Sequence, residues 1–256
     1  MRCDASGAQA SQRQFSGAAH DSLTVVRRDL PYASSVPVVD DRRNADGDIE
    51  RPRFARAYLR FGPEAERRGA ADHRIRFLRG LRGTVLELGA GSGLNFARYP
   101  SEVTEVIAVE PEPTLRAAAV SAARQVPVTV RVVAGIADEL PAQDGSVDAA
   151  IASLVLCSVP DQDRALLELR RVIRPGGELR FYEHVIPLGQ PGRLLLQLAD
   201  RSGVWPKLAG GCHPARDTAA AIERAGFRIT SSERIMFAAH RLEPAIPYIL
   251  GVARRV

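Results

Sequence analysis

Short apolar runs alternate with helical patterns along most of the chain. A run of four to eight apolar residues between turn residues is typical of a buried parallel strand. Strands that alternate with helices predict an α/β fold, in which helices cover both faces of a mostly parallel sheet. The last two runs form a hairpin-like pair. The runs that we interpret as strands are 84–88, 105–109, 128–133, 147–153, 178–184, 227–236 and 248–253.

Two helices can be placed by their end residues. Asp161 is suited to cap the start of one helix, and Pro175 with Gly176 ends it. The second helix covers 218–225 and is closed by Gly226. The apolar residues of the first helix fall on one face, which indicates a structural role: Ala165, Leu166, Leu169, Val172 and Ile173.

The first 82 residues differ from the rest. Residues 1–50 show no sustained apolar period, so we expect a disordered tail. Residues 51–82 hold ten Arg against three acidic residues, a local charge of +7 that could attract nucleic acid or an acidic membrane. However, Phe54, Tyr58 and Phe61 recur at helical spacing. We therefore interpret the arginines as the solvent-exposed face of amphipathic helices on the substrate side. No nucleic-acid-binding signature accompanies them, and we expect no nucleic-acid partner.

Composition limits the remaining choices. The 256 residues suffice for one α/β domain, placed at 83–256, and leave the oligomeric state open. Cys3, Cys157 and Cys212 fit neither a disulfide framework nor the spacing of zinc ligands, so we expect a reduced, cytoplasmic protein without a metal. The apolar run 23–26 is too short for a signal-peptide core, and no run of 18 apolar residues occurs. We therefore expect a soluble protein without stable membrane insertion.

The most informative stretch is 85–95, where an apolar strand turns into a glycine-lined bend. Glycine lets backbone approach a ligand where a Cβ would clash. Glu87 is an isolated carboxylate within the strand and needs a partner, for which a ligand's ammonium group is a candidate. The next strand ends at Glu110, which is placed to bind a ribose diol. A dinucleotide-binding fingerprint would need glycine at the position of Leu94, so the bend predicts a nucleoside-like cofactor and argues against NAD.

Four motifs in this order resemble the class I S-adenosylmethionine-dependent methyltransferases of the type 11 group. They are 87–93, 109–111, 145–148 and 174–177. The resemblance implies a Rossmann-like sheet of seven strands in the order 3-2-1-4-5-7-6, with the last strand antiparallel. It also implies S-adenosyl-L-methionine as cofactor, S-adenosyl-L-homocysteine as product, and these cofactor-binding residues: Glu87, Gly89, Ala90, Gly91, Ser92, Gly93, Asn95, Glu110, Pro111, Ile136, Ala137, Ser153 and Leu154.

Less generic segments resemble a narrower group, the mammalian alkyl-thiol methyltransferases and their bacterial relatives. The segments are 95–100, 154–159, 181–185 and 211–212. This resemblance implies methyl transfer to a small lipophilic acceptor, with a thiol or hydroxyl favoured. Methylation of a lipid headgroup nitrogen or a quinone carbon is an alternative, and a protein that binds the cofactor without catalysis is another.

Two features depart from these families. Where an Asp often binds the adenine amino group in these families, this chain has Ile136 before Ala137, which leaves the adenine to backbone and apolar contacts. The nearby Asp138 is an alternative partner. The mammalian relatives are membrane-associated through an apolar N-terminus, and residues 1–50 have no such run.

The acceptor side is less well defined by sequence. His184 ends the strand 178–184 at the ligand crevice and is the candidate base or acceptor-orienting group, the alternative being a structural hydrogen bond. Glu183 either orients His184 or faces the cofactor, and Cys157, with nothing basic beside it in sequence, is interpreted as a small buried hydrophobe. The segment 187–212 is either a substrate lid or a helix that packs on the core. The candidate substrate residues are Tyr58, Val155, His184, Trp205 and His213, although 213–217 is equally suited to cap a helix.

Overall fold

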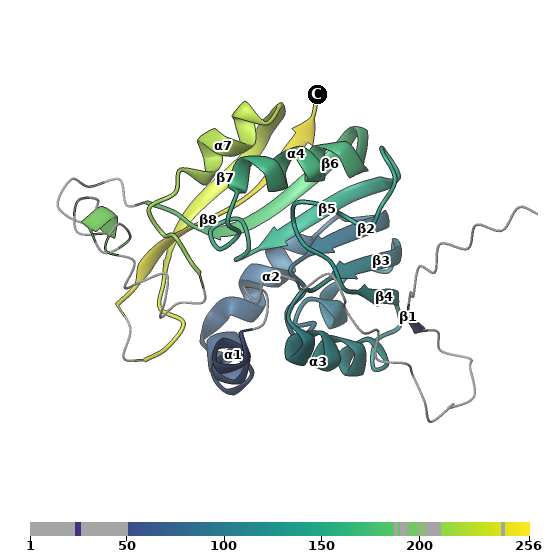
Figure 1. Ribbon diagram of the computed structural model, residues 1–256, viewed down its shortest axis with the longest axis horizontal. Coiled ribbons are helices and arrows are strands. Elements are labelled where there is room, and N and C mark those ends of the chain that lie inside the picture. The colour runs from purple at the N-terminus through teal and green to yellow at the C-terminus, as the bar shows by residue number, and fades with distance from the viewer. Residues whose placement is uncertain are drawn as a thin grey trace, which may run out of the picture.

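One twisted sheet of eight strands organises the molecule (Figure 1). The computed structural model describes residues 24–26, 51–186, 211–241 and 244–256, together with 189, 194, 196–198, 200 and 202. The strand order is β1-β4-β3-β2-β5-β6-β8-β7. The strands are β1 (Thr24–Val26), β2 (Gly83–Leu88), β3 (Val103–Val109), β4 (Thr129–Val133), β5 (Val147–Ser153), β6 (Ile173–His184), β7 (Phe227–Phe237) and β8 (Ile246–Arg255).

The topology confirms the fold that the resemblance implied. Strands β4, β3, β2, β5 and β6 pair in parallel. Strand β8 lies between β6 and β7 and is antiparallel to both, which gives the order 3-2-1-4-5-7-6 for the seven predicted strands. Strand β1 adds an eighth, antiparallel to β4. The sequence pattern predicts no strand there, because three residues are too few to show a period.

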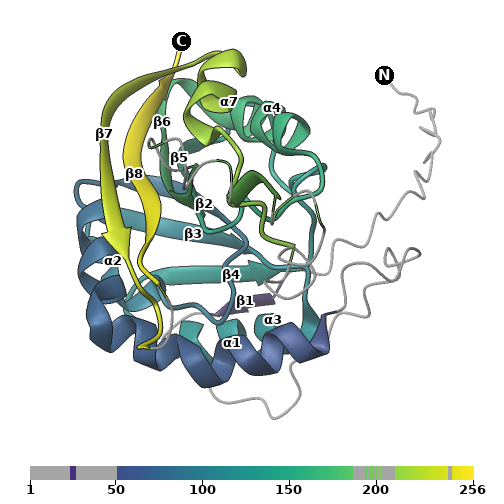
Figure 2. The ribbon, with the colours of Figure 1, turned by 90° about the vertical axis from the view of Figure 1, so that its left-hand side faces the viewer.

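Helices lie on both sides of the sheet (Figures 1 and 2). One side carries α1 (Pro52–Ala65), the π-helical η1 (Glu66–Ala70), α2 (Ala71–Leu78), the short η2 (Phe96–Arg98) and α3 (Pro113–Ala123); the other carries α4 (Gln162–Val172) and α7 (Thr218–Arg224). Figure 2 shows α1 running alongside α3. Asp161 caps α4 as predicted, since its carboxylate accepts from the backbone N–H of Arg164 at 2.9 Å.

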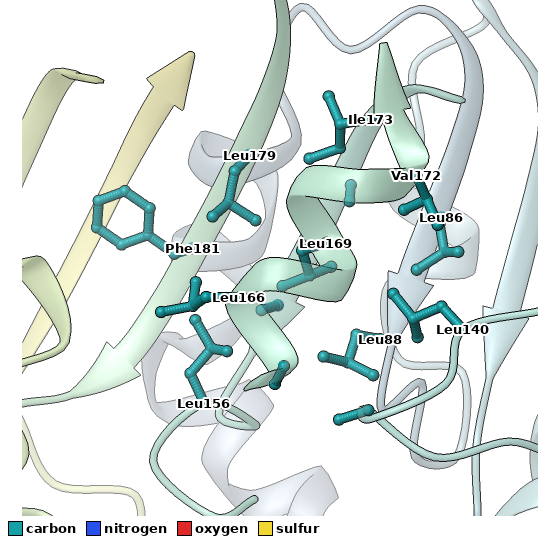
Figure 3. Packing of buried hydrophobic residues seen from close by; sticks show 14 of the residues in the cluster. Leu86, Leu88, Leu140, Leu156, Leu166, Leu169, Val172, Ile173, Leu179 and Phe181 are labelled. Carbon is teal, nitrogen blue, oxygen red and sulfur yellow. The ribbon is translucent and has the colours of Figure 1, made fainter. Parts of the chain in front are cut away.

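The core holds the strand ends in place. Figure 3 shows Leu166, Leu169 and Val172 of α4 against residues of β2 and β6, and all three are fully buried. Each such side chain contributes about 1.5–3 kcal/mol through burial. The carboxyl ends of the parallel strands β2, β3, β5 and β6 therefore form a firm edge, where ligands bind in sheets of this kind.

Most of the predicted lid 187–212, including Trp205, lies outside the described residues. Among the helices that the structure describes, none is both long and apolar enough to cross a bilayer.

Candidate functional site

The glycine bend follows β2 and is packed on both sides. Gly89 and Gly91 have φ angles of +64° and +58°, which side chains rarely adopt. A Cβ on Gly89 would also collide with the side chain of Val155, and one on Gly91 would lie 3.0 Å from the Tyr58 hydroxyl oxygen. Tyr58 and Val155, both predicted to be substrate residues, thus border the bend.

Glu87 is buried at the end of β2 and is partnered within the protein. Its carboxylate accepts hydrogen bonds from the Asn95 side-chain amide at 2.7 Å and from the Tyr99 hydroxyl at 2.8 Å. Burial raises the pKa of this carboxyl to about 7, although both hydrogen bonds and the charge of Arg74 act to lower it. A cation bound beside Glu87 would therefore favour its ionised form.

Arg74 connects the N-terminal helices to this site. It donates to the Glu66 carboxylate at 2.8 Å, to the Asn95 side-chain oxygen at 3.0 Å and to the Ser153 hydroxyl at 3.3 Å. The arginines of residues 51–82 were interpreted as a solvent-exposed face, and this was wrong for Arg74, which is only 6 % exposed. A signal was present, because Arg74 precedes Phe77 and Leu78 by three and four residues and so shares their apolar face of α2.

Glu110 lies at the end of β3, where it was expected. Its carboxylate accepts from the backbone N–H groups of Gly91 at 2.7 Å and Glu112 at 2.9 Å. Burial raises its pKa to about 7. The neighbouring Pro111 carbonyl accepts from Arg116 at 2.8 Å, which fixes the start of α3. Each carboxylate oxygen retains a second lone pair with which to accept from a ligand hydroxyl.

The two residues considered for the adenine differ in exposure. Ile136 is 39 % exposed and forms an isolated bridge with Glu139, whereas Ala137 is buried. Both follow β4, next to the edge that carries Glu110, so their place in the fold is compatible with the predicted contact.

The loop after β5 is held by Glu183. Its buried carboxylate accepts from the backbone N–H groups of Val155, Leu156 and Cys157 at 3.0–3.1 Å. These three bonds hold the loop after β5 in place, a role that was not predicted for Glu183. Leu154 begins the loop with φ +61°, a strained value for a residue with a Cβ. Strain of this kind persists where the surroundings fix the backbone, and it is common at functional sites.

His184 lies at the end of β6 in a sulfur-rich setting. Its Nδ1 is 3.2 Å from Cys212 Sγ and 3.6 Å from Cys157 Sγ, and the two sulfurs are 3.7 Å apart. Its ring packs against Tyr248 with a centroid separation of 4.4 Å. Cys157 is buried, as predicted, and the bond from Cys212 together with burial raises its thiol pKa. The cluster could not be predicted from the sequence, because its three members lie 27 and 28 residues apart along the chain.

His213 is held beside the same cluster. Its backbone N–H donates to the Cys157 carbonyl at 2.7 Å, and its Nδ1 is 2.9 Å from an Asp200 carboxylate oxygen. The stretch 213–217 caps a helix as predicted, because the Asp217 carboxylate accepts from the backbone N–H of Ala220 at the start of α7.

This arrangement suits the transfer of a small group between two ligands. One half of the edge offers a glycine cradle and two buried carboxyls with raised pKa values, Glu87 and Glu110. The other half offers an imidazole and two thiols beside a strained loop. The halves meet where Val155 packs on Gly89.

Comparisons with known proteins identify the family. The methyltransferase domain family matches residues 86–181. The chain is 35% identical to the thiol S-methyltransferase TMT1B of Mus musculus over 184 residues, which cover 70% of this chain and 74% of the relative. It is 36% identical to TMT1B of Homo sapiens over 70% of this chain and 74% of that relative.

Solved structures show the same fold. A methyltransferase from Thermotoga maritima, described as a possible histamine N-methyltransferase, superposes with a TM-score of 0.59 and 22% identity over 80% of this chain and 97% of its own. A geranyl diphosphate methyltransferase in complex with S-adenosylmethionine gives a TM-score of 0.56 at 17% identity, over 73% and 85% of the two chains.

The chain therefore belongs to the class I S-adenosylmethionine-dependent methyltransferases. Within that class it belongs to the group that contains the thiol S-methyltransferases, and S-adenosylmethionine is its methyl donor.

Proposed function

We propose that this enzyme methylates the sulfur of a small lipophilic thiol. The observation that carries the proposal is the 35–36% identity, over 70% of the chain, with proteins named thiol S-methyltransferases. When bound, S-adenosylmethionine supplies a methyl group that its sulfonium has already activated. The protein has to align the acceptor, exclude water and favour a thiolate.

The residues at the glycine bend fit this cofactor. At Gly89 and Gly91 the side chains of Val155 and Tyr58 lie so close to the backbone that a Cβ would collide with them, which keeps the bend narrow beside the proposed cofactor. We propose that Glu87, with Asn95, lies at the amino-acid end of the cofactor, where a positive charge would favour the ionised carboxyl. Glu110 with Pro111 takes the ribose hydroxyls, and Ile136 and Ala137 border the adenine. The remaining contacts come from Gly89, Ala90, Gly91, Ser92 and Gly93 and from Ser153 and Leu154.

The acceptor occupies the other half of the edge. We propose that Tyr58, Val155 and His213 line it, with Trp205 from the segment outside the described residues. His184 contacts the acceptor sulfur or its proton. A thiol has an ordinary pKa near 8.5, so modest help suffices to deprotonate it, whereas a hydroxyl acceptor would need a stronger base.

An assay of S-adenosylhomocysteine release tests the proposal. It would compare aliphatic thiols, phenols, amines and quinols with wild type, His184→Ala and the control His240→Ala. We expect turnover with thiols, a large loss in His184→Ala and none in His240→Ala, whose ring pairs with Glu64 and is not one of the proposed site residues. Turnover with amines or quinols alone would favour the lipid-headgroup or quinone alternative. Binding of S-adenosylhomocysteine without turnover of any acceptor would favour a non-catalytic role.

The compartment that we propose is the cytoplasm. Cys157 and Cys212 are free thiols only 3.7 Å apart, a pair that a reducing compartment preserves. Fractionation of the source cells would test this assignment.

A further inference from the structure

Three metal-ligating side chains converge on one point of the acceptor half. They come from separate segments: Cys157 from the loop after β5, His184 from the end of β6, and Cys212 from the segment before α7. One ligand atom from each lies within 4.8 Å of the other two. No other set of three or more His, Cys, Asp or Glu in the described part of the chain meets in this way.

The spacing matches a tetrahedral zinc site. Zinc lies about 2.3 Å from a thiolate sulfur and about 2.0–2.1 Å from an imidazole nitrogen, so tetrahedral angles place two sulfurs about 3.8 Å apart and a sulfur and nitrogen about 3.6 Å apart. The structure has 3.7 Å between the sulfurs of Cys157 and Cys212, and 3.6 Å and 3.2 Å from these sulfurs to His184 Nδ1. We propose that Cys157, His184 and Cys212 bind a zinc ion and leave its fourth position open to the acceptor thiol.

Hydrogen bonds within the protein hold the loop that carries Cys157 in place without a metal ion. Glu183 accepts from the Cys157 N–H, and the His213 N–H donates to the Cys157 carbonyl. Side chains of Gln162 and Arg216 both donate to the Leu156 carbonyl, at 3.1 Å and 2.9 Å. Partners that orient the ligands in this way tune metal sites and raise their affinity. Hydrogen bonds to the backbone therefore set the position of Cys157. A small hydrophobic residue in the core would not need them.

Burial and charge also fit a dication. Both cysteines are buried, and two thiolates with a neutral imidazole neutralise Zn²⁺. His184 is only half-buried, so the cluster is reachable from the edge of the sheet. Three protein ligands with an open position are the pattern of catalytic zinc sites, whereas structural sites have four.

This inference rests on the proposed thiol acceptor. The acceptor thiol binds the ion through sulfur and releases its proton to solvent. Its sulfur then forms a bond to the methyl carbon as the bond between that carbon and the cofactor's sulfonium breaks, and the electron pair of the broken bond stays with S-adenosylhomocysteine. The thioether product, a weaker ligand than a thiolate, leaves the metal. His184 then acts as a ligand, and the ion provides the deprotonation.

Metal binding by the full chain is the first test. Protein stripped with a chelator under reducing conditions would be titrated with Zn²⁺ and with Co²⁺, whose spectrum reports thiolate ligands and tetrahedral geometry. We expect one ion per chain, and a loss of affinity on the order of 100-fold or more in Cys157→Ala, Cys212→Ala and His184→Gln. The controls Cys3→Ala and His240→Gln should bind as wild type. Binding of S-adenosylhomocysteine by each variant shows that the cofactor half has folded.

Two results would overturn the site. One is that reduced wild-type protein binds no metal ion. Protein that was purified in air with a Cys157–Cys212 disulfide, and that still binds no metal after reduction, gives the same result. The other is wild-type affinity in both cysteine variants.

A second measurement separates this proposal from the function itself. Addition of an aliphatic thiol should change the Co²⁺ spectrum of wild type, and zinc-free protein should methylate thiols at least about tenfold more slowly, with recovery on adding Zn²⁺. Full thiol turnover without metal would refute the zinc proposal and leave the thiol methyltransferase intact. A zinc site in a protein that methylates amines but no thiol would refute the proposed acceptor instead.

Discussion

Replacing Glu87 by Gln tests the electrostatics of the cofactor end. Burial raises the pKa of this carboxyl from 4.5 to about 7 in the folded protein. Below pH 4.5 it is protonated in both states, and its contribution to stability is fully present. As the pH rises towards 7, the unfolded chain releases the proton while the folded protein retains it, so the free energy of unfolding falls. Over about 2.5 pH units, at about 1.4 kcal/mol each, the loss is about 3 kcal/mol.

The side-chain amide introduced by Glu87→Gln would mimic the neutral carboxyl at every pH. We expect this variant to match wild type near pH 4.5 and to exceed its unfolding free energy by about 3 kcal/mol at pH 8, with a Tm higher by roughly 6–12 °C. The same change should weaken binding of S-adenosylhomocysteine, because the ligand's ammonium loses a carboxylate. In wild type that affinity should rise between pH 6 and 8 as Glu87 ionises.

Urea unfolding at pH 5, 6, 7 and 8 and calorimetric titration with S-adenosylhomocysteine would measure both effects. Glu102→Gln, at an exposed position before β3, is the matched control and should change neither. A stability difference that is the same at pH 5 and pH 8, or a variant less stable than wild type at pH 8, would refute the reasoning.

Three further changes address other parts of the site. Gly89→Ala places a Cβ against Val155 at a φ of +64°, and we expect at least about tenfold weaker binding of S-adenosylhomocysteine by calorimetry, whereas Gly189→Ala, with open space around it, should bind normally. Arg74→Met removes the donor shared by Glu66, Asn95 and Ser153 and should lower the free energy of unfolding by about 3 kcal/mol in urea; an equal loss in the exposed Arg76→Met would contradict the importance of the buried network. Glu183→Gln leaves one backbone N–H of the loop after β5 without a hydrogen-bond partner, which should lower the free energy of unfolding by about 1–3 kcal/mol. It should also raise the KM for the methyl acceptor; an unchanged KM would show that this loop does not shape the acceptor site.

The parallel strands could be predicted because each is a short apolar run. The predicted strand 147–153 coincides with β5, and β2 differs from its prediction by one residue. The assignment of Ile173 to the helix capped by Asp161 was wrong, because α4 ends at Val172 and Ile173 begins β6 by pairing with Val147. Strand β8 begins at Ile246, two residues before its predicted start. Order in the sheet came from the resemblance and not from the pattern.

The position of a candidate residue could be predicted where one strand end defines it, and not where distant segments meet. Glu87 and Glu110 lie at the ends of apolar strands, so their place at the edge can be read locally. The partners of Glu183 could not be predicted, because alternation along a strand gives a side chain's face and not what lies opposite it. Cys157 and Cys212 are 55 residues apart in the chain and 3.7 Å apart in space, a contact that only the folded loops create.

The insertion of β8 between β6 and β7 constrains how the sheet can be completed during synthesis. Strand β7 leaves the ribosome before β8, which is its only neighbour among the described strands. Until β8 emerges, β6 and β7 both present bare edges, and pairing them directly would exclude the last strand. Charged residues along β7, among them Arg228, Glu233 and Arg234, are the kind that discourages premature edge pairing. The polarity of β7 thus disfavours its direct pairing with β6 before β8 is in place.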